Sequence, residues 1–305
     1  MTYDQFWQRL ATVYDRHEAQ AVARTVLDTV FGMTLTDICC GKVTQLSADE
    51  GARLEKIIRR LEKSEPVQYV LGEAWFCGRR FTVRPGVLIP RPETEDLAAW
   101  AVELSAQQAK EQAQKTKEQA TQADGGATQA DGGATQAPRL LDIGTGSGCL
   151  AATLALDIPG AEVTAWDISP DALAIASDNA RQLGAHVTFS LRDALHAPAD
   201  DSQWSLIVSN PPYILERERT AMHRNVTDYE PPLALFVHDD DPLLFYRAIA
   251  RYALRALRPG GWLLFEANTA FAADVAAMGR QLGFGRVEVR PDRFGRPRDV
   301  AMQRA

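Results

Sequence analysis

The chain has few cysteines, no excess of basic residues and no long apolar run, and each shortage excludes a class of protein. Its four cysteines among 305 residues lack metal-ligand spacing, so neither a disulfide-rich secreted domain nor a metal site is expected. Acidic residues outnumber basic ones by 40 to 33, and this formal net charge of −7 argues against a large nucleic-acid surface. Without a signal peptide or a run of membrane-spanning length, we expect a cytoplasmic protein with no membrane partner and no direct nucleic-acid partner.

The first 73 residues predict a small all-α domain. Apolar side chains recur at helical spacing over 1–64, and a capping box formed by Ser47 and Glu50 opens one of the helices. Alternating apolar residues over 74–92 then predict a β-hairpin that links two domains. The remaining residues, 93–305, alternate strands with helices, which predicts an α/β fold with a largely parallel sheet and helices on both of its faces.

A low-complexity insertion interrupts the second domain at 105–137. The heptapeptide Ala-Thr-Gln-Ala-Asp-Gly-Gly occurs at 120–126 and again at 127–133, and it has paired glycines but no large apolar side chain to bury. We expect a helix over about 94–104, which the first part of the insertion is able to extend. The rest of the insertion predicts a flexible linker.

A strand, a glycine loop and the start of a helix follow one another over 139–152. Three glycines at alternate positions let the backbone approach a ligand closely, and the helix N-terminus behind them favours a polar or anionic group. Dinucleotide-binding folds place the third glycine three residues after the second, whereas here it follows after two. The candidate ligand-binding residues of this loop are Gly144, Thr145, Gly146, Ser147 and Gly148.

Acidic residues lie at the ends of three successive strands. Asp142 stands just before the glycine loop, Asp167 ends a predicted strand at 161–167, and Asp193 closes another at 186–191. An acid in the position of Asp167 is able to hold ribose hydroxyls, as acids do in nucleotide-binding folds. Each acid taken singly is equally well explained as a helix cap. Their occurrence at one strand end after another favours a cofactor site.

A fourth predicted strand, at 205–208, runs into a rigid turn made of Asn210, Pro211, Pro212 and Tyr213. Each proline fixes its own φ and keeps the residue before it out of the helical region, so the Asn210 side chain and the neighbouring carbonyls point in fixed directions. The turn is able to accept two hydrogen bonds from one planar –NH2 group while the aromatic ring covers its face. An isolated Asn-Pro-Pro more often just ends a strand, but the glycine loop upstream favours a functional turn.

This order of strands, loops and acids resembles that of class I S-adenosylmethionine-dependent methyltransferases. The resemblance implies that the glycine loop holds the methionine part of S-adenosyl-L-methionine, that Asp167 holds its ribose, and that Asp193 and Ala194 lie at its adenine. It also places Asn210 beside the cofactor. An aromatic that often follows the third-strand acid is replaced here by Ala194, so the group that stacks on adenine must come from elsewhere. The Asn-Pro-Pro-Tyr motif is typical of enzymes that methylate a planar amide or amino nitrogen.

Further segments at 66–78, 89–95, 229–235 and 258–262 closely resemble the peptide chain release factor glutamine methyltransferases, the HemK/PrmC family. This resemblance implies methylation of the side-chain amide of the glutamine in the Gly-Gly-Gln motif of class 1 peptide chain release factors, which the N-terminal domain would help to recognise. One departure is Glu-Ala-Asn at 266–268, where the family commonly carries Glu-x-Gly. The catalytic residues implied by the resemblance are Asn210, Pro211, Pro212 and Tyr213.

Three other functions stay open at the level of the sequence. A related family methylates a glutamine of a large-subunit ribosomal protein, and residues 73–78 are compatible with it, although 89–95 and 230–232 favour the release-factor family. An adenine-N6 methyltransferase is less well supported, because the chain has neither a basic stripe nor a basic target-recognition domain. A non-catalytic binding module would have to explain why both the glycine loop and the Asn-Pro-Pro-Tyr turn are intact.

Overall fold

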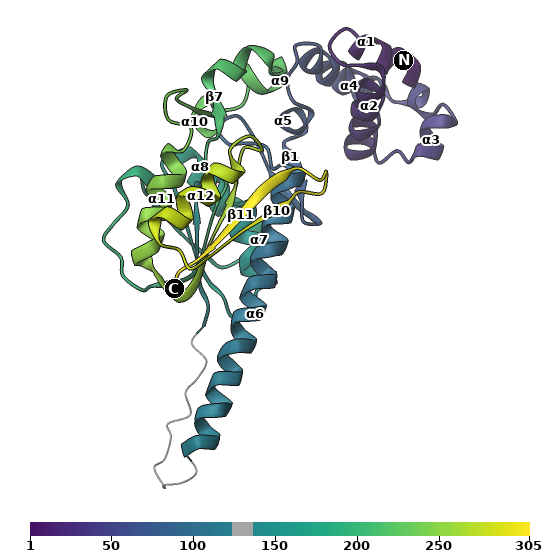
Figure 1. Cartoon of the computed structure of the whole chain (residues 1–305). Helices are drawn as coiled ribbons and strands as arrows, with labels where there is room; N and C mark the ends of the chain where they lie inside the picture. Colours follow the sequence, from purple (N-terminus) through teal and green to yellow (C-terminus); the bar gives the residue numbers. More distant parts are fainter. Residues whose placement is uncertain (124–136) are drawn as a thin grey trace.

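Two bodies of different make-up form the molecule, a helical N-terminal domain and an α/β domain built on one central sheet (Figure 1). The computed structural model describes residues 1–123 and 137–305. The glycine-containing repeats predicted to be a flexible linker, from residue 124 to 133, lie outside the described residues. The predicted combination of a mostly parallel α/β sheet and an N-terminal helical region is confirmed.

Capped helices make up the N-terminal domain. The side chain that precedes each main helix accepts a backbone N–H of its first turn, and at Ser47 the predicted capping box with Glu50 is present. The apolar faces of these helices enclose a separate core, in which Phe6, Leu27 and Ile58 are fully buried. The elements are α1 (Tyr3–Leu10), α2 (Arg16–Phe31), α3 (Leu35–Cys39), the 3-10 helix η1 (Lys42–Gln45) and α4 (Ala48–Leu61).

The linker between the two bodies consists of α5 (Val67–Leu71) and an antiparallel hairpin of β1 (Glu73–Phe76) and β2 (Arg79–Thr82). Strand pairing therefore covers less of the chain than the predicted hairpin at 74–92. Prolines prevent a continued ladder beyond Val83, because they cannot donate a backbone hydrogen bond. The following loop is instead anchored by side chains: the Tyr69 hydroxyl donates to the Val87 carbonyl at 2.5 Å.

The central sheet of the described chain has seven strands: β3 (Arg139–Ile143), β4 (Glu162–Asp167), β5 (Val187–Leu191), β6 (Trp204–Ser209), β9 (Leu257–Glu266), β10 (Arg286–Pro291) and β11 (Pro297–Gln303). Their order is β10-β11-β9-β6-β3-β4-β5. The five strands from β9 to β5 run parallel, and β11 and β10 close one edge in antiparallel fashion. The chain moves outward from β3 to β5 and then returns to place β6 beside β3, so the strand order reverses between β3 and β6.

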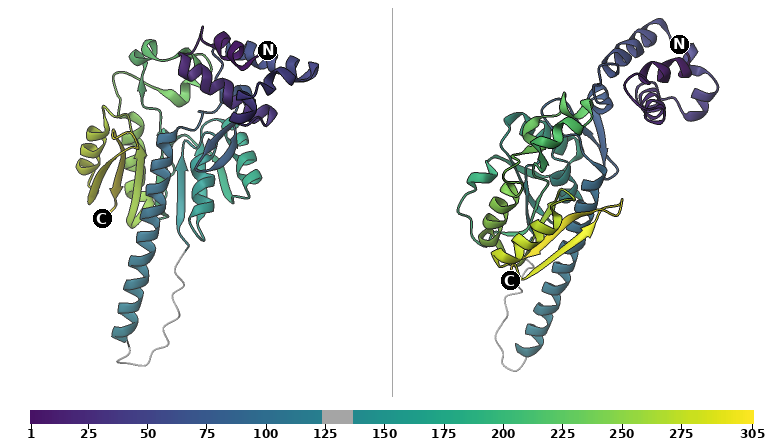
Figure 2. Two further views of the ribbon diagram at one scale, coloured as in Figure 1. Left: turned by 90° about the vertical axis from the view of Figure 1, so that its right-hand side faces the viewer. Right: turned by 45° about the horizontal axis from the view of Figure 1, so that its top comes forward.

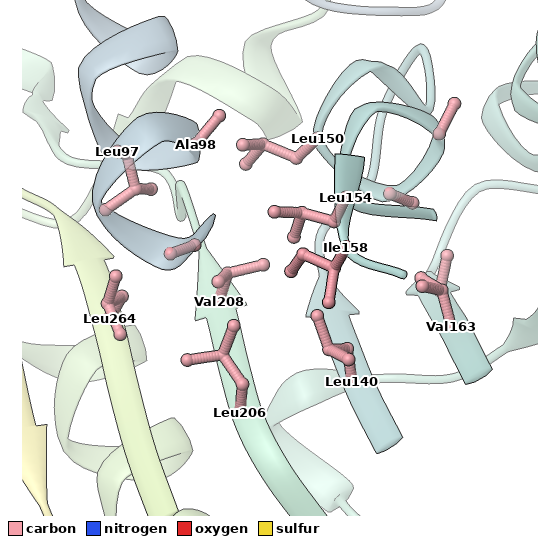
Figure 3. Close-up of a cluster of buried hydrophobic side chains, with 14 of the residues drawn as sticks. Leu97, Ala98, Leu140, Leu150, Leu154, Ile158, Val163, Leu206, Val208 and Leu264 are labelled. Carbon is pink, nitrogen blue, oxygen red and sulfur yellow. The ribbon is translucent and has the colours of Figure 1, made fainter. Parts of the chain in front are cut away.

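Helices cover both faces of this sheet. On one face lie α6 (Pro92–Ala123), α7 (Cys149–Asp157) and part of α8 (Pro170–Leu183); on the other lie α11 (Leu244–Ala256) and α12 (Ala272–Leu282). Neighbouring strand residues alternate between the two layers, so Leu140 packs with the first and Leu141 with the second. Figure 3 shows Leu97 of α6 and Leu154 of α7 above the strand side chain Leu206.

Helix α6 is much longer than the helix predicted over 94–104, because it continues to Ala123. Residues 105–123, the first part of the low-complexity insertion, extend this helix, and the physical reason lies in their composition. Gln, Ala, Lys and Glu favour helix, and side-chain bonds between Gln107 and Glu111 (2.9 Å) span one turn. The last turns project beyond the sheet, away from the N-terminal domain (Figure 2). No described helix is both long enough and apolar enough to cross a membrane.

Several short elements lie among the strand-to-helix connections at the carboxyl ends of the strands. The connection after β5 contains one turn of 3-10 helix, and the excursion between β6 and α11 forms a small layer of its own, in which two short strands pair in parallel. These elements are η2 (Ala194–His196), β7 (Ile214–Leu215), η3 (Glu216–Ala221), α9 (Arg224–Thr227), α10 (Pro232–Leu235) and β8 (Phe236–Val237).

Candidate active site

One row of residues crosses the sheet where its parallel strands end. The register pairs Ile143 of β3 with Trp166 and Ser209 on its two sides, and it pairs Ser209 with Phe265 of β9. The row straddles the point between β3 and β6 where the strand order reverses, which is where open α/β sheets bind ligands. The next residue along each strand therefore belongs to the row, in the order Asp167, Gly144, Asn210 and Glu266.

The glycine loop after β3 is open at Gly146 and tightly packed against α8 at Gly148. Gly146 has a φ of 54°, and a Cβ built on it would meet nothing within 4 Å. A Cβ on Gly148 would lie only 2.9 Å from the Cβ of Ala176 in α8, so this glycine allows the loop to pack against the helix. Below the loop, the Thr145 hydroxyl donates to Asp142 at 2.7 Å, and burial raises the pKa of Asp142 to about 7. Asp142 therefore supports the loop from beneath.

Asp167 closes the loop on the β4 side. Its two carboxylate oxygens accept backbone N–H groups from Gly146 and Ser169, each at 2.9 Å. An ionised carboxylate has about four lone-pair positions, so each oxygen is still able to accept a hydroxyl. Burial raises the pKa of Asp167, against these backbone hydrogen bonds. Asp167 therefore keeps lone pairs for a ligand beside Gly146, where an added Cβ would meet nothing.

Asp193 lies at the end of β5, farther along the same edge. It caps the turn η2, because its side chain accepts the Leu195 N–H at 2.8 Å and lies 2.7 Å from Nδ1 of His196, whose hydrogen bond lowers the pKa of Asp193. Ala194 packs against the core beside α11 and offers no aromatic face. Two exposed apolar side chains at these strand ends, Ile168 (49 % exposed) and Leu195 (39 %), were missed by the sequence analysis. The sequence pattern that could have found them is an apolar residue shortly after a strand-end acid: Ile168 directly follows Asp167, and Leu195 stands two residues after Asp193.

The Asn-Pro-Pro-Tyr turn is held from behind by hydrogen bonds. Asn210 Nδ2 donates to the Thr94 hydroxyl at 3.2 Å, and the Tyr213 hydroxyl donates to Glu266 Oε1 at 3.1 Å. Asn268, in the segment that departs from the family pattern, donates its side-chain N–H to the Tyr213 carbonyl at 3.2 Å. Burial and the Glu266 charge raise the pKa of Tyr213 well above its usual value. The tyrosine is therefore a neutral, fixed ring.

A cavity of about 110 Å³ opens beside this turn. Its walls are mainly apolar, and Arg91 contributes the one cationic side chain among the described residues that line it. The guanidinium of Arg91 pairs with the buried Glu230 at 2.6 Å, and the same carboxylate accepts the Ile89 N–H at 3.0 Å. This pairing joins the segments 89–95 and 229–232. The cavity is lined by Leu88, Arg91, Asn210, Tyr213, Ile214, Met222, Val226, Ala234 and Leu235.

The structure thus gathers the predicted residues Gly144–Gly148, Asp167, Asn210 and Tyr213 at one edge of the sheet, with Asp193 at the end of the outer strand β5. Sequence reasoning missed Thr94 and Glu266, which are hydrogen-bonded to Asn210 and Tyr213 but come from α6 and from the end of β9. Within the described residues, no cluster of three or more His, Cys, Asp or Glu side chains could hold a metal ion.

Comparison with known proteins decides the family. The description "PrmC N-terminal domain" matches residues 3–72, and "Methyltransferase small domain" matches residues 129–230. A protein of Bacteroides thetaiotaomicron named release factor glutamine methyltransferase is 43% identical over 298 residues, which covers 97% of both chains. The chain belongs to the release factor glutamine methyltransferase family.

A second member of the family, from Flavobacterium psychrophilum, is 34% identical over 97% of this chain and 95% of its own. Among solved structures, a methyltransferase from Pyrococcus furiosus is 18% identical over 55% of this chain and 76% of its own, with a TM-score of 0.42. That likeness is too remote to add to the argument. The members of the family are methyltransferases, so the predicted enzyme class is confirmed.

Proposed function

We propose that this chain transfers the methyl group of S-adenosyl-L-methionine to the side-chain amide nitrogen of the glutamine in the Gly-Gly-Gln motif of class 1 release factors. The observation that carries the proposal is the placement of Asn210 next to the glycine loop, with its amide NH2 held by Thr94. No described residue donates to Asn210 Oδ1. This oxygen and the Pro211 carbonyl offer two acceptors, which match the two N–H bonds of one planar amide.

The cofactor would lie along the row of strand ends. When bound, it supplies a methyl group already activated by its sulfonium. The loop 144–148 would hold the amino-acid part, and the free lone pairs of Asp167 would accept the ribose hydroxyls. Ile168 and Leu195 would provide the apolar faces for adenine that Ala194 does not, while Asp193 would lie near its edge.

Orientation supplies much of the acceleration in this proposal. A glutamine amide nitrogen is a poor nucleophile because its lone pair is delocalised into the carbonyl, and it is too weakly acidic to be deprotonated first. Hydrogen bonds to Asn210 Oδ1 and to the Pro211 carbonyl would aim the nitrogen and increase its electron density. Well-oriented reactants contribute about 7–11 kcal/mol to a lower barrier. The proton would leave after transfer, through Asn210 or water, so no strong base is required.

The substrate side chain would enter through the cavity beside Asn210. Its apolar lining suits the two methylene groups of glutamine, and the Tyr213 ring, fixed through Glu266, would cover the plane of the amide. The N-terminal domain lies on the same side of the molecule as this edge of the sheet (Figure 1). That position supports a role for the domain in recognising the body of the release factor.

The deciding experiment measures transfer of label from S-adenosyl-L-methionine to a purified class 1 release factor. The native Gly-Gly-Gln factor is compared with a Gly-Gly-Asn factor, which differs by one methylene. We expect label on the native factor alone. No label on either factor, with cofactor binding intact, would contradict the proposal and direct the test to the ribosomal protein and then to a non-catalytic role.

Asn210→Ala tests the acceptor assigned to the reaction. We expect turnover to fall by about 10²-fold or more, because the substrate amide loses both its orientation and an electrostatic partner. Binding of S-adenosyl-L-methionine, measured by calorimetry, is the control and should change little. A variant with near-normal turnover would remove Asn210 from the mechanism.

A further inference from the structure

We infer that Thr94 and Glu266 are positioning residues that fix the orientation of the Asn210 side-chain amide, with its nitrogen toward Thr94 and its oxygen away from it. The inference rests on the proposed function, because it concerns the acceptor that Asn210 would offer to the substrate. Both residues come from outside the Asn-Pro-Pro-Tyr turn: Thr94 lies in the first turn of α6, and Glu266 is the last residue of β9.

The three side chains form a continuous chain of hydrogen bonds. Asn210 Nδ2 lies 3.2 Å from Thr94 Oγ1, and Thr94 Oγ1 lies 2.5 Å from Glu266 Oε2. Thr94 is 3 % exposed and Glu266 is fully buried, so bulk water does not compete for these bonds. Glu266 also accepts the Tyr213 hydroxyl on its other oxygen at 3.1 Å. The carboxylate is thus the common end of the hydrogen bonds that hold Asn210 and Tyr213.

The direction of this chain follows from which groups are able to donate. An ionised carboxylate only accepts, so the single hydroxyl proton of Thr94 goes to Glu266. The Thr94 oxygen then has only lone pairs left, and it requires a donor from Asn210. The NH2 of Asn210 must therefore face Thr94, which leaves Oδ1 facing away from it.

Without such a constraint the amide has two nearly equal orientations. The oxygen and the nitrogen of an asparagine side chain are close in size, and only the hydrogen-bond network distinguishes them. A flipped Asn210 would present its NH2 group to the NH2 group of a glutamine substrate, and two donors form no hydrogen bond. Glu266 therefore acts on the substrate through Thr94 and Asn210, without touching it.

Arg298 and the strand pairing maintain this arrangement. Arg298 Nη1 lies 4.0 Å from Glu266 Oε1, and its own side chain is fixed by Asp292 at 2.9 Å. Asp299 is the cross-strand partner of Glu266 in the antiparallel pair β11 and β9. Burial raises the pKa of Glu266, whereas the Thr94 hydroxyl, the Arg298 charge and the Tyr213 hydroxyl each lower it. These three groups therefore favour a carboxylate that accepts from both Thr94 and Tyr213.

The first test compares Thr94→Val, which removes the hydroxyl at nearly constant volume, with Thr94→Ser, which keeps it. We expect Thr94→Val to lower kcat about tenfold, the effect of one lost hydrogen bond, with an unchanged Kd for S-adenosyl-L-methionine. Thr94→Ser should retain most of the turnover. The matched control is Thr153→Val in α7, where a buried threonine has a hydroxyl that finds no partner among the described residues. Equal turnover of Thr94→Val and wild type would overturn the inference.

A double-mutant cycle separates positioning from a merely structural role. If Thr94 acts through Asn210, adding Thr94→Val to Asn210→Ala should cost almost nothing further, because no amide remains to be oriented. If the same tenfold loss appears in the Asn210→Ala background, Thr94 acts by another route and the inference fails.

The last measurement does not depend on any substrate. The side-chain NH2 of Asn210, assigned by its loss in Asn210→Ala, is followed by NMR hydrogen exchange. We expect slow exchange in the wild type and Thr94→Ser, and faster exchange in Thr94→Val. Glu266→Gln, which can donate as well as accept, should also speed exchange, and it replaces Thr94→Val if that variant does not fold. Unchanged exchange in the folded variants would overturn the inference, whereas a wild type that methylates no glutamine would overturn the proposed function alone.

Discussion

At the residue scale, Asp167 serves the glycine loop and the proposed cofactor at once. It accepts the N–H groups of Gly146 and Ser169, and we propose that its remaining lone pairs accept the ribose hydroxyls. We expect Asp167→Ala to weaken S-adenosyl-L-methionine binding at least about tenfold, because a hydrogen bond to a charged group is worth about 1.5–3 kcal/mol. Calorimetric titration measures this, with the exposed Asp171→Ala as the control. Equal affinities would exclude the ribose contact.

Asp299 gives the fold a pH dependence of predictable sign. Burial, and then the Glu266 charge, raise its pKa to about 8, so the folded state keeps a proton that the unfolded chain, with a pKa of about 3.9, releases earlier. The stability from this proton is fully present below the unfolded pKa and is lost as the pH rises toward 8. An asparagine in this place is neutral at every pH.

We therefore expect the free energy of unfolding of the wild type to fall between pH 5 and pH 8, relative to Asp299→Asn, by more than about 1 kcal/mol. Urea unfolding of the two proteins at both pH values measures the difference. The matched control is Asp240→Asn, the same substitution at an exposed position. Parallel curves for wild type and Asp299→Asn would show that Asp299 is ionised in the folded protein.

The residues that could be predicted from the sequence are those next to a recognisable strand end. Gly144, Asp167 and Asn210 each follow or end a short apolar strand, and parallel strands bring their carboxyl ends to one edge. Thr94 and Glu266 gave no such signal of their own. Thr94 reaches Asn210 only because α6 packs across the sheet, and that contact depends on tertiary structure rather than on local pattern.

At the scale of elements, the length of α6 is set by amino-acid composition beyond the point where its apolar residues end. Its first turns carry Leu97 into the core. The described side chains of its later turns, such as Gln114 and Glu118, are exposed, and they favour helix by propensity and by bonds to each other. A prediction that follows apolar periodicity ends the helix when the apolar residues end, at about 104. The strands β3 to β6 were predicted to within about two residues, because each is apolar and bounded by turn residues or acids.

Deleting 120–133 should leave methyl transfer intact. The N-terminal end of α6 supports the candidate active site, and its C-terminal end lies at the opposite end of the sheet (Figure 1). We expect kcat and KM for the release factor to stay within about twofold of the values for the full chain. Changes at surface positions remote from a site usually have effects of this size. Steady-state labelling with S-adenosyl-L-methionine measures both constants.

The melting temperature of the deletion variant distinguishes a catalytic effect from an effect on folding. A large loss of turnover together with an unchanged melting temperature would mean that the deleted segment takes part in the reaction. A loss of turnover together with a lower melting temperature would instead mean that the deletion destabilises the sheet domain. Either result would contradict the expectation that these residues are dispensable.

At the scale of the whole molecule, the helical domain and the sheet domain are joined by the linker and by few polar contacts. One of them links Tyr229, the neighbour of Glu230, to Lys63, which follows the last long helix of the helical domain: the Tyr229 hydroxyl donates to the Lys63 carbonyl at 2.8 Å. The two domains have separate cores, so their relative placement depends on such contacts.

Tyr229→Phe removes this hydrogen bond and nothing else. We expect KM for the release factor to rise several-fold while kcat and cofactor affinity stay the same, because a protein substrate that contacts both domains requires them in register; the loss of one bond is worth about 1 kcal/mol. Tyr3→Phe is the matched control, since the Tyr3 hydroxyl donates to the Gln20 carbonyl at 3.1 Å within the helical domain. A Tyr229→Phe enzyme with an unchanged KM would indicate that this contact does not set the domain arrangement.

The polar arm formed by the last turns of α6 has a practical use. It leaves the sheet domain on the side away from both the strand-end edge and the helical domain (Figure 2). A surface attachment or a fluorescent label placed near its end would tether the protein with its reactive edge turned toward solution. A protein substrate could then approach that edge from solution, and α6 itself would serve as the spacer.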